Sequence, residues 1–128
     1  MESEEFPTEW HQQRTYDSLL TYGLSAIKFV LFVNGGAILS TLTFLGNRAD
    51  ITASLLCALI WFVSGVVAGG LVHATAYLTQ FTLFNERDNE HPPWYRNHMK
   101  WLYLSMFLIL VGISCFAIGA FTAVSALS

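Results

Sequence analysis

Charged residues are scarce in this sequence. Only 12% of its 128 residues are Asp, Glu, Lys or Arg, whereas 54% are hydrophobic. A typical soluble domain has about 25% charged residues, so the deficit excludes an ordinary soluble fold. The charge is also segregated, because Asp, Glu, Lys and Arg are missing from residues 29–47, 51–85 and 101–128. Each of these runs reaches the roughly 18 residues that a membrane-crossing helix needs.

Other shortages exclude further classes of protein. The chain has 2 cysteines, Cys57 and Cys115, and both fall inside the uncharged runs, so neither a disulfide nor a zinc site is expected. The N-terminal sequence MESEEFPTEW has no basic segment and is not typical of a secretory signal peptide. The sequence has no Ser-His-Asp pattern, His-Glu-x-x-His motif or phosphate-binding loop. We therefore predict no enzymatic activity and no cofactor.

The uncharged runs predict an all-α integral membrane protein with three transmembrane helices, at residues 24–46, 51–80 and 101–125. Residues 24–128 then form the transmembrane domain, with a loop at 81–100. Residues 1–23 form a tail and a helix, which either lies on the membrane surface or extends the first span into the cytoplasm. Three helices cannot enclose an aqueous channel alone, so a pore requires a homo-oligomer, such as a tetramer.

The distribution of basic residues predicts the orientation in the membrane. One side carries five of them, Arg14, Lys28, Arg87, Arg96 and Lys100, and the other side carries only Arg48. Because basic residues are retained in the cytoplasm, we expect the N-terminus and the 81–100 loop to be cytoplasmic and the C-terminus to lie outside.

Small and polar residues interrupt the spans in a pattern that predicts helix packing. In lipid, helices associate through small residues that permit close approach and through polar contacts. The third span repeats a small residue every seven positions, at Ser105, Gly112, Gly119 and Ala126. Asn34 has two interpretations: an interhelical hydrogen bond, or a position that faces water in a pore. The predicted packing glycines are Gly35, Gly36, Gly65, Gly69, Gly112 and Gly119.

Lys28 and His73 lie near the predicted cytoplasmic mouth of the spans. Ionisable residues within a membrane are candidates for a functional site, so both are predicted to line a pore together with Asn34. The alternatives are that Lys28 extends its amine to the interface and that His73 makes an interfacial hydrogen bond. A haem between spans would need a second axial ligand, which another copy of the chain could supply.

Basic and aromatic residues alternate around the predicted cytoplasmic mouth. Arginine beside aromatic rings is a common arrangement for binding phosphates and stacked bases. The alternative is positive-inside charge with an interfacial aromatic belt, which needs no ligand. The candidate ligand-binding residues are Arg14, Arg87, Trp94, Arg96, His98 and Lys100.

The size of the chain, its three uncharged spans and this basic, aromatic mouth resemble the small transmembrane effectors of bacterial anti-phage systems, in particular the membrane effector of Hailong-type defence. The resemblance lies in the general architecture. It implies an ion channel of the bacterial inner membrane, held closed by an oligonucleotide that a partner nucleotidyltransferase makes, whose opening depolarises the cell. The acidic residues Glu86, Asp88 and Glu90, which stand among the basic ones, depart from this pattern.

Two other functions remain open from the sequence. The number of spans and the length are similar to those of succinate dehydrogenase anchor subunits, in which case His73 would bind haem or the site would bind a quinone. The Ser-His-Arg and quinone-site signatures of those subunits are missing. The third possibility is a structural, holin-like membrane protein without a ligand.

Overall fold

The computed structural model describes residues 8–47, 52–86 and 98–126. These residues form three α-helices, α1 (Thr8–Gly46), α2 (Ala53–Glu86) and α3 (His98–Ser125), and the same ranges contain no strand. Each helix includes a segment long and apolar enough to cross a membrane: Asp17–Gly46, Ala53–Leu83 and His98–Ser125. The predicted all-α fold with three candidate spans is therefore confirmed.

α1 runs without a break through Asn34, Gly35 and Gly36. In hydrocarbon no water competes for the backbone groups, so a helix survives glycines that would weaken it in water. The segment before the predicted first span belongs to the same helix and is therefore an extension of that span. Because α1 has 39 residues, it is ~58 Å long at ~1.5 Å per residue. It therefore tilts or projects beyond a ~30 Å hydrocarbon core.

The other two helices differ from the predicted spans mainly at one end of the bundle. α2 continues to Glu86 and α3 begins at His98, so the predicted loop at 81–100 is shortened from both sides. At the opposite end, Thr52 caps α2, because its carbonyl oxygen accepts from Leu55 N at 3.1 Å and from Leu56 N at 3.3 Å. The cap satisfies backbone donors that the first helical turn would otherwise leave unpaired.

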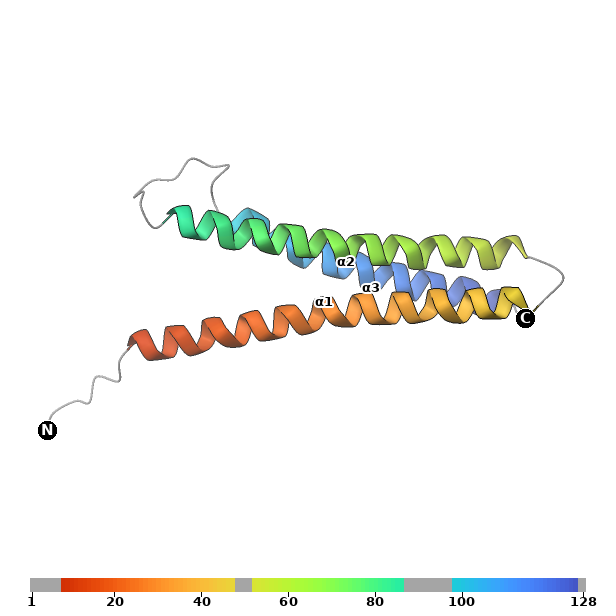
Figure 1. The fold of residues 1–128 in the computed structure, drawn as a ribbon, viewed down its shortest axis with the longest axis horizontal. Coiled ribbons are helices and arrows are strands. Elements are labelled where there is room, and N and C mark those ends of the chain that lie inside the picture. The colour runs from red at the N-terminus through yellow and green to blue at the C-terminus, as the bar shows by residue number, and fades with distance from the viewer. Residues whose placement is uncertain (1–7, 48–51, 87–97, 127–128) are drawn as a thin grey trace, which may run out of the picture.

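The three helices alternate in direction along one long axis (Figure 1). α2 packs against α3 more extensively than α1 packs against either of them. Towards its N-terminus α1 diverges from α2, which leaves the bundle more open there (Figure 1). We call this the N-terminal end of the bundle; it holds the beginning of α1, the end of α2 and the beginning of α3. The C-terminus lies at the opposite end.

Candidate functional site

Asn34 lies at the centre of the bundle, where all three helices meet. Its side chain is 0% exposed. The amide Nδ2 donates to Val30 O within α1 at 2.9 Å and to Gly112 O of α3 at 3.2 Å. In lipid such an interhelical hydrogen bond stabilises packing by about 1 kcal/mol. The amide thus ties α1 to α3, and it does not reach the surface of the single chain.

The amide oxygen of Asn34 accepts no hydrogen bond from the described residues. It faces Gly65 of α2, because a Cβ built on that glycine would contact Asn34 Oδ1 and lie 2.7 Å from Nδ2. In glycine a hydrogen on Cα takes the place of Cβ, so the group of Gly65 that faces Asn34 Oδ1 is a Cα–H group, which is only a weak hydrogen-bond donor. The absence of a side chain at residue 65 is what allows Asn34 to fit between α2 and α3.

Three other glycines allow equally close contacts. A Cβ on Gly112 would lie 2.5 Å from Val30 Cγ1, and one on Gly119 would lie 2.6 Å from the ring of Phe62. On α2, a Cβ on Gly69 would lie 2.7 Å from Leu31 Cδ2. Distances below 3.0 Å leave no room for a methyl group without movement of the neighbour. The seven-residue series of the third span therefore lies in a close-packed seam.

Gly35 and Gly36 are placed differently. A Cβ on either would have no neighbour within 4 Å, and Gly36 is exposed. Within this chain they adjoin no other helix, although Asn34 beside them is buried. These two glycines would allow close approach of a helix only at a contact between copies of the chain.

A second polar contact joins α2 and α3 nearer the N-terminal end. Ser105 Oγ donates to Thr75 Oγ1 at 2.8 Å, and both residues are buried. Thr75 Oγ1 also lies 3.1 Å from Leu71 O, an acceptor one turn earlier in its own helix. Together with the Asn34 contact, this pair fixes the register of the three helices.

The surface of α1 that points away from α2 and α3 carries small and polar residues among apolar ones. Residues spaced three or four positions apart share one face of a helix. We use the name "α1 outer face" for the exposed small or polar residues of this surface: Ser25, Lys28, Gly36, Ser40 and Thr43. Phe29, Phe32 and Leu39 are exposed among them. The three-to-four-residue spacing was visible in the sequence, but it could not be assigned to a surface without the structure.

Hydroxyl groups on the α1 outer face are satisfied within their own helix. Ser25, Ser40 and Thr43 donate to the carbonyl oxygens four residues earlier, at 2.8, 2.9 and 2.8 Å. Their oxygens therefore face outward as acceptors. The outer surfaces of α2 and α3 expose mainly large apolar side chains, with Val67 57%, Leu110 63% and Phe121 76% exposed. On α2, Ser64, Gly70 and His73 are exposed among them.

The structure separates the three predicted pore-lining residues. Lys28 lies on the α1 outer face, His73 is exposed on α2, and Asn34 is buried. Lys28 and Asn34 therefore occupy opposite sides of α1. His73 belongs to no group of three or more potential metal ligands in the described part of the chain.

Half of the predicted ligand-binding residues can be placed. Arg14 and Lys100 are exposed and His98 is half-buried, all at the N-terminal end of the bundle. Arg87, Trp94 and Arg96 lie outside the described residues. Basic residues from α1 and α3 thus share one end of the bundle.

The fold and these contacts define a three-helix protein of the kind that spans a membrane. The chain matches no protein-family model, no curated protein and no solved structure.

Proposed function

We propose that this protein is a homo-oligomeric ion channel in which the α1 outer face lines the pore. The observation that carries the proposal is the asymmetry of the three helix surfaces. Between residues 25 and 43, five of the nine exposed residues of α1 are small or polar, whereas the exposed residues of α2 and α3 are mainly aliphatic or aromatic, with Ser64 and His73 of α2 among the exceptions. Exposed polar groups in a span ordinarily face a water-filled cavity or another protein surface.

An arrangement of several copies around a central axis would place the α1 outer face and the apolar surfaces of α2 and α3 each in a suitable environment. The α1 outer faces would turn inward towards water, and the apolar surfaces of α2 and α3 would turn outward towards lipid. Gly36 supports this arrangement, because it offers a flat surface that no helix of the same chain covers. Asn34 would then hold the pore-lining helix on the α2–α3 pair through its bond to Gly112.

Control by a ligand is the second part of the proposal. Copies around an axis would repeat Arg14, His98 and Lys100 around one mouth of the pore. Repetition of a modest basic patch produces a strong local field. A polyanion bound there shifts the equilibrium between the closed and open channel only if it binds one of these two states more tightly than the other. The resemblance of the chain to Hailong-type effectors suggests that the ligand is an oligonucleotide and that it keeps the channel closed. In this proposal the channel lies in the bacterial inner membrane, with its N-terminus in the cytoplasm.

Replacement of Lys28 by glutamate is expected to reverse the charge selectivity of the channel. Lys28 is the only charged residue between Ser18 and the end of α1, so each copy would contribute one charge to a ring within the pore. Rings of charged side chains select ions of opposite sign. Purified protein in a planar bilayer under a KCl gradient should show an anion-favouring reversal potential, and the variant should show the opposite sign. Identical reversal potentials would contradict a pore lined by α1.

A short single-stranded oligonucleotide is expected to bind the detergent-solubilised oligomer, and added salt should weaken the binding steeply. Lys100→Glu combined with Arg14→Glu should lower the affinity by about tenfold or more, since two cations per chain are replaced by anions. Arg48→Glu, which the sequence predicts on the other side of the membrane, serves as the matched control. Equal affinity in both variants would show that Arg14 and Lys100 do not hold the oligonucleotide.

A further inference from the structure

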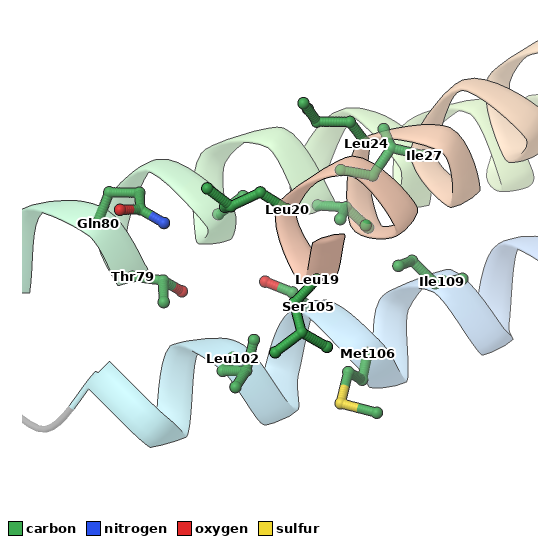
Figure 2. Close-up of a pocket in the computed structure, with 13 residues that line it drawn as sticks. Leu19, Leu20, Leu24, Ile27, Thr79, Gln80, Leu102, Ser105, Met106 and Ile109 are labelled. Carbon is green, nitrogen blue, oxygen red and sulfur yellow. The ribbon is translucent and has the colours of Figure 1, made fainter. Parts of the chain in front are cut away.

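The N-terminal end of the bundle contains a cavity between all three helices. Its volume is about 160 Å³, and its walls are almost wholly apolar. Leu20, Leu24 and Ile27 of α1 line it on one side, and Met106 and Ile109 of α3 on another (Figure 2). The cavity exists because α1 diverges from the other helices here and because Gly23, which also lines it, contributes no side chain (Figure 1).

The polar groups at the cavity are already engaged. Thr79 donates its hydroxyl to Thr75 O at 2.8 Å, and Ser105 is bonded to Thr75 as described above. Gln80, the remaining polar residue of the lining, is exposed.

The cavity is open on one side, since Leu19, Leu24 and Met106 of its lining are exposed. Water there would find few polar partners on these walls, and apolar atoms would gain dispersion contacts with them. A hydrocarbon is therefore the chemistry that suits the cavity.

The position of the cavity indicates where such a hydrocarbon comes from. The lining residues belong to the candidate membrane spans of all three helices, close to the end at which α1 begins before its own candidate span. Apolar cavities of about 150 Å³ are large enough to bind small hydrocarbons. In a bilayer, the hydrocarbon present at the highest concentration is the acyl chain of a phospholipid.

Basic residues lie next to the cavity along the chain. Lys100 precedes the lining residue Leu102 by two positions on α3, and Arg14 precedes Leu19 by five positions on α1. Both are exposed, and both precede the lining residues of their helices towards the N-terminal end of the bundle. Asp17 is exposed on the same turn of α1 as Arg14, so attraction to the phosphate would come from local contacts and not from a net positive field.

We propose that this cavity binds one membrane phospholipid, with an acyl chain between α1 and the α2–α3 pair and the phosphate near Lys100 and Arg14. The lipid would fill the gap that the divergence of α1 leaves. The site requires the three-helix fold and no pore, and it shares Lys100 and Arg14 with the proposed oligonucleotide site. Filling the cavity at Gly23 or Ala76 changes neither of these two residues, so it tests the lipid separately from the channel and its ligand.

Substitutions that fill the cavity test the proposal. Gly23→Phe places a ring in the cavity, because a Cβ at Gly23 has no neighbour within 4 Å. Ala76→Phe fills the cavity from α2 and replaces Gly23→Phe as the test if Gly23→Phe does not fold. Gly70→Phe is the matched control, since this exposed glycine also has no neighbour within 4 Å and does not line the cavity. Circular dichroism checks that each variant is helical.

The measurement is native mass spectrometry of protein extracted from vesicles of palmitoyl-oleoyl phosphatidylglycerol. Wild type and Gly70→Phe are expected to retain one phospholipid per chain through delipidation, whereas folded Gly23→Phe or Ala76→Phe should retain about tenfold less. Lys100→Gln should also lower retention. Equal retention in wild type and a folded cavity-filled variant would overturn the proposal.

Discussion

Replacement of Gly65 by alanine is expected to destabilise the bundle by about 2–4 kcal/mol, although alanine is normally the better helix former. The added methyl group would occupy the space of the Asn34 amide, which is wholly buried and cannot move into solvent. Overpacking costs about 1–3 kcal/mol, and loss of the Asn34–Gly112 bond adds about 1 kcal/mol. The free energy of unfolding is measured by titration with sodium dodecyl sulfate in mixed micelles.

A double-mutant cycle isolates this contact. Asn34→Ala alone should cost about 1 kcal/mol through the lost interhelical bond. In that background Gly65→Ala should be tolerated much better, because the amide it would displace is gone. Coupling energies of about 0.5–3 kcal/mol are typical of residues in contact. Gly70→Ala, at an open position on the same helix, should be neutral or slightly stabilising. Strict additivity of the two central substitutions would show that they do not touch.

Simultaneous replacement of Ser25, Ser40 and Thr43 by leucine is expected to abolish conductance without preventing assembly. These hydroxyls are exposed on the α1 outer face and make hydrogen bonds only within their own helix, so the packing of the chain does not depend on them. A pore lined by leucine would exclude water, and dewetted constrictions block ions. Single-channel recording should show a decrease in open probability or conductance of about tenfold or more.

The matched control is Ser64→Leu combined with Ser114→Leu. These serines are also exposed, but they lie on α2 and α3, whose other exposed residues are mainly apolar. The control variant should conduct normally, because leucine suits a lipid-facing position. If it lost conductance while the α1 variant kept it, the pore would be lined by α2 or α3 instead.

Much of the fold was accessible from the sequence, because in lipid the requirements for a spanning segment are simple. A helix must satisfy its own backbone groups, and it must be long and apolar enough to cross the hydrocarbon. Three uncharged runs meet these conditions, and α1, α2 and α3 contain them. The ends were less accurate, since α2 extends past residue 80 and α1 begins well before residue 24. Hydropathy marks where lipid begins and gives no signal for a helix that continues into water.

The faces of the helices were decided only by the tertiary structure. In the sequence, Asn34, Gly35 and Gly36 are adjacent and predicted to share one packing role. In the structure, the amide of Asn34 is enclosed between Gly65 and Gly112, while Gly36 is exposed and has no neighbour. Successive residues on a helix point about 100° apart, so a run of small and polar residues cannot reveal which of them faces another helix.

The sequence by itself determined the class of element, the number of candidate spans and the seven-residue series of small residues on the third. It could not identify the partners of that series, because several glycines on each helix would allow an equally close approach. The tertiary structure chose them through side-chain shape: Val30 fits against Gly112, Phe62 against Gly119, and the flat amide of Asn34 against Gly65. That choice turned the α1 outer face, with Lys28 and its three hydroxyls, away from the bundle.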